Sequence, residues 1–307
     1  MSAGWVAGSV RARAMAQRRM GPDAVREVAA CGSLSDALRM LAGTVYGDGV
    51  RPEQPLAAAQ HGIAGTVLWN LRVLAGWLPR DGVRLLRVLA AWFELANVDE
   101  LLQSIAGRPV EAEFELGALG TAWPRLRQAT SEAELRAALA ASAWQDPGGQ
   151  DAHAVRLGMR ARWAVRAAAL GDPARAWAAG AVALLVAGEL FAVGRPVDRA
   201  VLGGALGMLG PDPHRASTLA ELAEAMPPRA GWVLAGIASP AGLWRAEETW
   251  LARVEQDGLR LLRTSSLDSA VVLGAVAVMA CDAWRARAAL EIAARGGAPL
   301  EAYDELA

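Results

Sequence analysis

One segment of the chain occurs twice, and this repeat constrains the fold more than any other feature of the sequence. GRPVEAEFELGALG at 107–120 aligns without a gap with GRPVDRAVLGGALG at 194–207. The two copies match at both ends, and the same register continues into the residues that follow. Self-similarity of this kind is typical of folds in which related structural units follow one another along the chain. We therefore predict a body made of related units.

The glycines of this segment raise the alternative of a phosphate-binding loop. Such a loop would require GxGxxG after a strand, or GxxxxGK[ST]. Neither pattern is present, no strand pattern precedes the segment, and all 31 basic residues are arginines. We interpret Gly107 and Gly194 instead as helix-ending residues at the boundaries between units.

Helical spacing dominates the rest of the sequence, so we predict an all-α fold. Apolar residues recur at steps of three and four, and alanine, leucine and arginine fill the positions between them. Ser33, Ser131 and Thr218 each precede an acidic residue by three positions, which predicts three helices that begin with a capping box. A further glycine turn, GGAP, stands at 296–299.

These signals together predict three helical lobes. The first lobe, with an N-terminal helix, is expected at 1–125, the second at 126–215 and the third at 216–307. Proline- and glycine-rich stretches such as WQDPGGQD lie between the predicted helices, as connecting loops do.

Composition narrows the classes of partner and compartment. A hydrophobic content of 54% excludes a disordered chain, and a formal net charge of −1 provides no basic field for nucleic acid. Cys31 and Cys281 are too few and too distant for a disulfide framework, which favours an intracellular setting. The longest apolar runs, near 176–188 and 270–281, fall short of the roughly 18–20 residues that span a bilayer. We expect them to be buried core helices.

Candidate catalytic or metal-binding groups are sparse. His61, His153 and His214 follow no metal-binding spacing, so we predict neither a metal site nor a cofactor. Glu94 and Asp99 point about 140° apart on a helix, which disfavours a shared acid–base role.

Two further clusters favour structural readings. In SSLDS, at 265–269, Ser265 or Ser266 is expected to cap a helix at 268–281. The arginines near the N-terminus are separated by two, five and one positions, which predicts a solvated helix face; they are Arg11, Arg13, Arg18 and Arg19. The same cluster could also meet phosphate or an acidic partner.

Several segments resemble the C subunit of rotary V/A-type ATPases, which is called subunit d in eukaryotic V-ATPases. The similar segments are SVRARAM at 9–15, LSDALRMLAGTVYG at 34–47, WFELANVDELLQSIAGRP at 92–109 and the following ELGALG. The residues on the family's positions are Arg11, Arg13, Thr44, Tyr46, Glu94 and Asn97.

The repeated units depart from this pattern to different degrees. Where the family's acid and asparagine would stand, the second sequence repeat has Ala181 and Leu184. The third sequence repeat keeps the acid as Asp282, but Arg285 replaces the asparagine. The lysine usual before the helix-ending glycine is missing throughout.

The resemblance implies a non-catalytic adaptor of a rotary motor. Members of that family have three pseudo-symmetric helical lobes in a funnel-like body, without a catalytic site or a cofactor. They join the central shaft to the membrane proteolipid ring and so couple ATP to proton transport. The expected location is a cytoplasmic complex that is peripheral to the membrane through its protein partners.

Two alternatives belong to other functional classes. One is a stand-alone α-helical scaffold that binds another protein through a concave surface. The other is an all-α enzyme with a site around Glu94 or Glu189.

Overall fold

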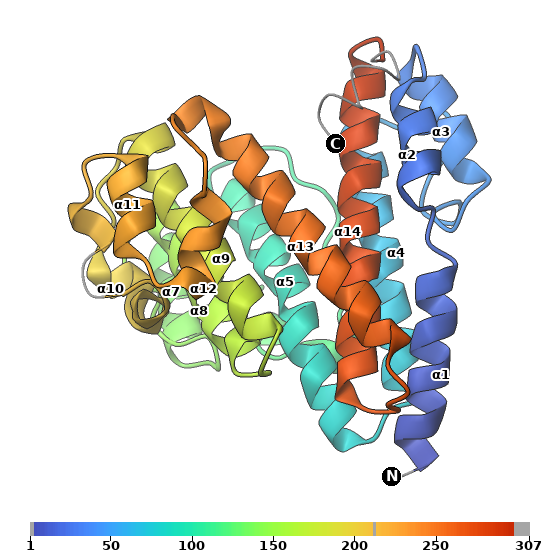
Figure 1. Ribbon diagram of the computed structural model, residues 1–307, viewed down its shortest axis with the longest axis horizontal. Coiled ribbons are helices and arrows are strands. Elements are labelled where there is room, and N and C mark those ends of the chain that lie inside the picture. The colour runs from blue at the N-terminus through green and yellow to red at the C-terminus, as the bar shows by residue number, and fades with distance from the viewer. Residues whose placement is uncertain (1–2, 211–212, 298–307) are drawn as a thin grey trace. The chain divides into compact units, whose positions relative to one another are not determined.

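The structure is a computed structural model that describes residues 3–210 and 213–297. Within these ranges every regular element is a helix and none is a strand, which confirms the predicted all-α class (Figure 1). The chain forms two compact units, each assembled from segments that are distant in sequence. Unit 1 comprises the described residues of 1–86, 111–119 and 257–307, and unit 2 comprises those of 87–110 and 120–256.

The helices are distributed between the units as follows. Unit 1 contains α1 (Ala3–Gln17), α2 (Pro22–Ala29), α3 (Leu34–Ala42), α4 (Leu56–Ala75) and α14 (Ser269–Ala294). Unit 2 contains α6 (Trp123–Leu126), α7 (Glu132–Ala140), α8 (Ala152–Ala168), α9 (Ala174–Ala187), α10 (Arg199–Leu202), α11 (Leu219–Ala225) and α12 (Pro228–Gly231). The unit boundary falls within α5 (Arg80–Ile105) and within α13 (Leu243–Arg263).

Short helical turns complete the secondary structure. The turns of 3-10 type are η1 (Gly117–Leu119), η3 (Gly203–Met208), η4 (Pro213–Arg215), η5 (Trp232–Leu234) and η6 (Pro240–Gly242). A π-helical turn, η2 (Gly188–Val193), continues α9. Both copies of the repeated GALG sequence therefore fall in 3-10 turns, η1 and η3.

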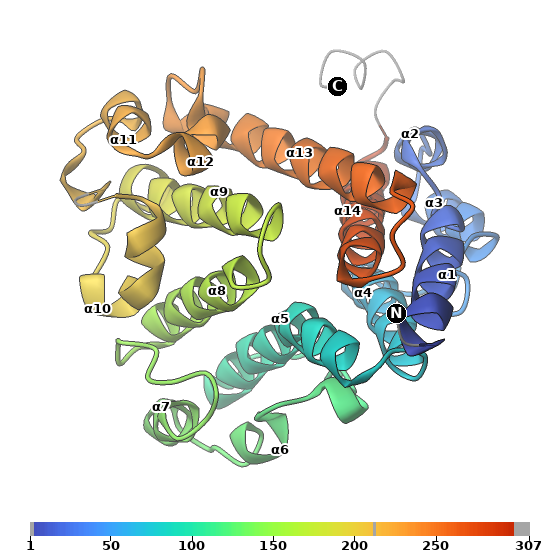
Figure 2. The same cartoon turned by 60° about the horizontal axis from the view of Figure 1, so that its bottom comes forward.

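Helix α14 forms the centre of unit 1. It packs against α1, α2, α3 and α4, so the C-terminal helix lies among the N-terminal ones (Figure 2). Every residue from Val271 to Met279 is buried, as expected for a helix that is apolar on all sides. Close packing with the end of α13 depends on two glycines, because a methyl group on Gly274 would lie 2.7 Å from the carbonyl oxygen of Gly258.

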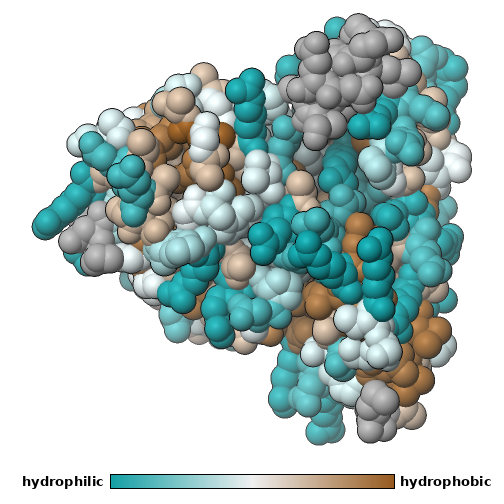
Figure 3. Space-filling view, in the orientation of Figure 1, coloured by the Kyte–Doolittle hydropathy of each residue, from teal (hydrophilic) through white to brown (hydrophobic). Residues whose placement is uncertain are grey.

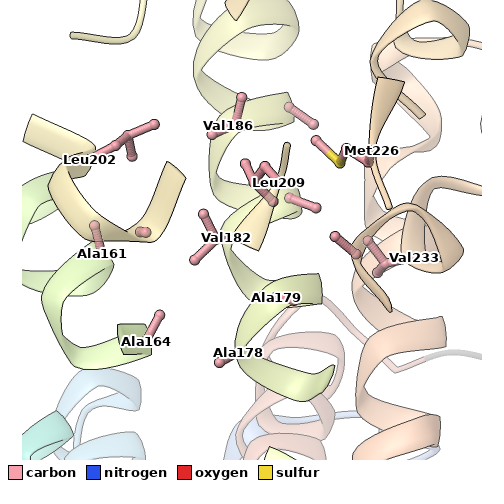
Figure 4. Close-up of a cluster of buried hydrophobic side chains, with 14 of the residues drawn as sticks. Ala161, Ala164, Ala178, Ala179, Val182, Val186, Leu202, Leu209, Met226 and Val233 are labelled. Atoms are coloured by element: carbon pink, nitrogen blue, oxygen red, sulfur yellow. The ribbon is translucent and has the colours of Figure 1, made fainter. Parts of the chain in front are cut away.

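The core of unit 2 is centred on the pair α8 and α9. Alanines on α8 face valines on α9, and Leu209, Met226 and Val233 close the other side of the cluster (Figure 4). Small side chains allow the two helices to approach closely. Gly180 on α9 allows two indoles to approach, since a methyl group there would lie 3.0 Å from atoms of both Trp232 and Trp250.

Glycines end the long helices, as the repeated segment predicts. Gly107 and Gly194 have φ of 71° and 72°, in the left-handed region that glycine adopts without strain. After α5 the Arg108 amide donates to the Gln103 carbonyl at 3.0 Å, the six-to-one bond of a Schellman motif. Gly296 and Gly297, after α14, also have positive φ. The interpretation of these glycines as helix ends is confirmed.

The three predicted helix starts are also confirmed. Ser33, Ser131 and Thr218 are the N-caps of α3, α7 and α11, and each hydroxyl accepts the backbone N–H three residues ahead. By contrast, the predicted cap of the 268–281 helix is wrong. Asp268 caps α14 by accepting from the Ala270 amide at 2.9 Å, and the helix continues to Ala294.

Two helical stretches are longer than their apolar runs suggested. Residues 174–193 and α14 are long and apolar enough to cross a membrane by length and composition. The most apolar windows are 50% and 72% buried respectively, as the core helices of folded proteins also are. The predicted lobes at 1–125, 126–215 and 216–307 follow the sequence repeat, whereas the two units follow packing, so the lobe boundaries stay a prediction.

Candidate functional site

Two buried carboxylates stand out among the residues that the sequence singles out. Glu94 on α5 is 0% exposed and Asp282 on α14 is 2% exposed. A carboxylate taken out of water is strongly destabilising unless it accepts hydrogen bonds. The groups that donate hydrogen bonds to each carboxylate therefore show which segments of the chain it holds together.

Asp282 accepts three hydrogen bonds within unit 1. Its oxygens receive the backbone N–H groups of Met20 at 3.1 Å and Gly21 at 2.8 Å, just before α2. The third donor is the phenol of Tyr46, 2.7 Å from Oδ2. Burial, and then the charge of Asp282 and this hydrogen bond, raise the pKa of Tyr46 well above its ordinary value. Tyr46 is therefore a neutral donor to the carboxylate.

Thr44 sets the position of Tyr46. Its hydroxyl donates to the Leu41 carbonyl at 2.7 Å, at the end of α3, and accepts the Tyr46 amide at 3.2 Å. The turn after α3 thus directs the phenol towards α14. Thr44, Tyr46 and Asp282, identified from segments at opposite ends of the chain, come together in one hydrogen-bonded group.

Glu94 accepts a denser set of donors within unit 2. Its carboxylate receives the backbone N–H groups of Thr121 at 3.3 Å, Ala122 at 2.5 Å and Trp123. The Thr121 hydroxyl and the indole N–H of Trp144 donate as well, the latter at 3.1 Å. Glu94 therefore holds the start of α6 and the segment after α7 against α5.

The turn after α7 repeats the turn after α3. The Ser142 hydroxyl donates to the Leu139 carbonyl at 2.7 Å and accepts the Trp144 amide at 3.1 Å. Ser142 and Trp144 thus match Thr44 and Tyr46 in place and in bonding, and in each turn an aromatic side chain donates to the carboxylate. We call each arrangement of acid, hydroxyl turn and aromatic donor the carboxylate clamp.

Sequence reasoning missed the members of the second clamp other than Glu94. The sequence did contain a signal for Ser142 and Trp144. They follow the capping residue Ser131 at the same spacings at which Thr44 and Tyr46 follow Ser33. No comparable signal marked Thr121, whose amide and hydroxyl both donate to Glu94.

A third acidic clamp does not form on α9. Ala181 and Leu184 are at the predicted positions, and neither side chain is an acid. An aromatic contact holds this helix instead, since the indole N–H of Trp250 donates to the Trp177 carbonyl at 2.8 Å. A related contact occurs on α8, where Trp163 donates to the Val88 carbonyl of α5 at 2.8 Å.

The remaining predicted residues have separate structural places. Asn97 is buried on α5, one turn beyond Glu94. Gly107 and Gly194 are the helix ends described above. The guanidinium of Arg13 donates to the carbonyls of Leu262, Thr264 and Ser266, at 3.1, 2.6 and 2.9 Å. Arg13 therefore holds the turn between α13 and α14.

The prediction of a solvated helix face for the N-terminal arginines holds for Arg11 and Arg18, which are exposed, and is wrong for Arg13. Arg13 is engaged with backbone carbonyls. Arg11, Arg18 and Arg19 line a single cavity in unit 1.

A catalytic or metal site would depend on Glu94, Glu189 or the histidines, and the structure shows what surrounds these side chains. Glu94 is enclosed and bonded to five donors, so a substrate would reach it only after the clamp opened. Glu189, in the π-helical turn, pairs with His153 at 2.7 Å. His61 stacks on Phe114 with ring centroids 4.0 Å apart, and the side chain of His214 lies outside the described residues. In the described part of the chain, no three His, Cys, Asp or Glu side chains gather as a metal site would need.

Comparisons with known proteins do not assign the chain to a family. No protein-family model matches the chain, and a search of curated proteins finds no similar sequence.

Proposed function

We propose that this chain is a non-catalytic adaptor of a rotary V/A-type ATPase. It would join the central shaft to the proteolipid ring of the membrane sector and pass torque between ATP hydrolysis and proton movement. The observation that carries the proposal is the carboxylate clamp, which recurs at Asp282 and at Glu94. Three of the residues that resemble the family's motifs, Tyr46, Glu94 and Asp282, take part directly in these clamps.

The clamp suits a part that transmits torque. Each clamp ties a long helix to a short helix start and to a hydroxyl turn through charge-assisted hydrogen bonds, which are shorter and stronger than neutral ones. Such bonds tie segments distant in sequence, as between Tyr46 and Asp282. A body that resists local opening transmits rotation with little loss.

The proposal includes three pseudo-symmetric lobes and a funnel-like body. The capping boxes at Ser33, Ser131 and Thr218 support three copies of one helix start. The copy that contains α9 lacks the acid, and the hydrogen bond from the Trp250 indole to the Trp177 carbonyl holds that helix instead.

Exposed apolar side chains provide surfaces for the proposed partners. Trp69 and Trp77 are 57% and 51% exposed, and Trp92, Trp244 and Trp284 are each at least 40% exposed. Hydrophobic side chains also gather over the first half of α1, where Val10 is 58% exposed (Figure 3). Tryptophans are enriched among the residues that dominate binding at protein interfaces.

Capture from native membranes tests the proposal. The tagged chain, expressed in its own host at native level, should bring down the shaft and proteolipid-ring subunits after mild solubilisation. Trp69→Ala and Trp244→Ala should weaken this capture without loss of helical content, because both side chains are exposed. Arg263→Ala, at an exposed arginine, is the matched surface control and should capture normally.

The other outcomes separate the alternatives. A monomer without these partners would overturn the adaptor proposal. A single unrelated partner would instead favour the stand-alone scaffold. Substrate turnover that Glu94→Gln removes from a folded protein would favour the enzyme.

A further inference from the structure

Unit 1 contains a cavity of about 420 Å³ beside the C-terminal half of α1 and the middle of α4. Pockets for small molecules commonly have volumes of about 300–1,000 Å³. The inference that follows does not rest on the adaptor function.

Three arginines form the α1 side of the cavity. Arg11 is on α1, and Arg18 and Arg19 are in the turn that directly follows the helix; all three line the cavity. None of the three forms an ion pair with a described residue. The Nε atom of Arg19 is buried without a hydrogen-bond partner. This wall thus carries three positive charges, none of which is in an ion pair with a described residue.

The α4 side of the cavity is open and ends at an indole. A methyl group on Gly65 would meet no atom within 4 Å, so the helix surface there is an open floor. Trp69, one turn further along, is 57% exposed and lines the same cavity. Its indole provides a flat apolar surface against which a planar group can pack.

Two acidic residues also line the cavity, and they balance the three arginines only in part. The Asp282 carboxylate is occupied by Met20, Gly21 and Tyr46. Asp48 is exposed, and no described arginine pairs with it. The cavity is therefore lined by three guanidinium groups and two carboxylates, so the charge of its lining is positive, although Arg19 also donates to the Ala16 carbonyl at 3.2 Å.

We propose that this cavity binds a small organic phosphate. The phosphate group would lie against Arg11, Arg18 and Arg19, and the planar or apolar remainder would cover Gly65 and pack on Trp69. Guanidinium groups recognise phosphate with paired hydrogen bonds, and a phosphate monoester carries about two negative charges at pH 7. Both parts of the cavity are needed, so neither phosphate alone nor the apolar group alone is a full ligand.

Calorimetric titration of the 307-residue chain tests this assignment with 1-naphthyl phosphate, 1-naphthol and inorganic phosphate as probes. The phosphate ester should bind at one site, at least about tenfold more tightly than either fragment, which corresponds to about 1.4 kcal/mol. Its affinity should fall as salt is raised, because the contacts are ionic. If both fragments bind as tightly as the ester, or if no saturable binding occurs, the proposal is wrong.

Paired variants locate the binding. Arg18→Gln/Arg19→Gln should weaken the ester by at least about tenfold, whereas Arg263→Gln, at an exposed arginine of the same unit, should leave it unchanged. Gly65→Leu should abolish binding by filling the cavity while every arginine remains, and Gly65→Ala should retain it. Circular dichroism verifies that each variant is folded. Binding by a folded Gly65→Leu protein at the original affinity would overturn the proposal.

Discussion

Tyr46 and Trp144 occupy corresponding places in the two carboxylate clamps, and they differ in the group that donates to the acid. In unit 1 a phenol donates to Asp282 at 2.7 Å, and in unit 2 an indole donates to Glu94 at 3.1 Å. The hydroxyl turns that position the two rings have nearly the same geometry, with Thr44 in one and Ser142 in the other. The clamp is thus defined by donors and acceptors, and each residue type within it can change.

The surroundings of the two clamps also differ. The Arg166 guanidinium lies 5.0 Å from the centre of the Trp144 ring, and burial lowers its pKa despite the opposing charge of Glu94. Asp282 borders the arginine-lined cavity, whereas Glu94 is 0% exposed. Glu94 also accepts from five donors and Asp282 from three. The Glu94 clamp is therefore expected to contribute more to stability, and the Asp282 clamp to respond more to solution conditions.

Removing the acids should have the largest effect and should rank the two clamps. Glu94→Ala leaves three backbone N–H groups, two of them buried, and the Trp144 indole without an acceptor. We expect it to lower the free energy of unfolding by about 3–5 kcal/mol, and Asp282→Ala to lower it by about 2–4 kcal/mol. Chemical denaturation measures both values. Glu224→Ala, at an exposed acid in α11, should change it by less than about 0.5 kcal/mol. Equal effects at Glu94 and Glu224 would show that the clamp contributes nothing to the free energy of unfolding.

A second comparison concerns the glycines at the seventh position of α4 and of α8. A methyl group on Gly62 would overlap the carbonyl oxygen of Gly49, and one on Gly158 would overlap that of Pro147. Each alanine variant must shift the turn before its helix, at a cost of about 1–3 kcal/mol. The same denaturation measurement applies. Unchanged stability in one variant would show that the close approach is not common to both units.

Loss of the phenol should have a smaller effect. Tyr46→Phe removes one donor from buried Asp282 and should lower the free energy of unfolding by about 1–2 kcal/mol at pH 7. The Tyr46 variant should also change how stability depends on pH, because the pKa of Tyr46 is raised above its ordinary value of 10.0.

The sign of that dependence follows from proton binding. Above pH 10 the unfolded chain loses the Tyr46 proton while the folded protein keeps it, so stability falls by up to about 1.4 kcal/mol per pH unit. Denaturation curves between pH 8 and 11 should show this loss in the parent protein and a flatter limb in Tyr46→Phe. Trp144→Phe should leave the alkaline limb as steep as in the parent, because an indole does not ionise there. An identical limb in the parent and Tyr46→Phe would contradict the assignment.

Local chemistry explains why the helix ends were predictable. The caps at Ser33, Ser131 and Thr218 and the glycine ends at Gly107 and Gly194 depend on groups a few residues apart. Their patterns can therefore be read directly from the sequence. Glu94 and Asp282 were identifiable as acids on otherwise apolar helices.

The partners of these acids were not predictable for a physical reason. Glu94 is held chiefly by backbone N–H groups near Thr121, and Arg13 by backbone carbonyls near Thr264, and such groups leave no trace in residue identity. The two-unit packing was missed because it depends on α14 returning to α1 and α4, a contact between opposite ends of the chain. The cavity was missed because its walls come from segments that are distant in sequence, with Arg11 and Arg18 near the N-terminus and Trp69 on α4.

The smallest expected effect has the opposite sign and tests the difference between two glycines on one helix. Gly65 lies three residues after Gly62 on α4, but a methyl group there meets nothing within 4 Å. Gly65→Ala should therefore raise the free energy of unfolding by about 0.5–1 kcal/mol, since alanine loses less backbone entropy in a helix than glycine. Denaturation of Gly65→Ala beside Gly62→Ala gives the comparison. Destabilisation by Gly65→Ala would mean that the floor of the cavity is closed, and would also weaken the case for a ligand there.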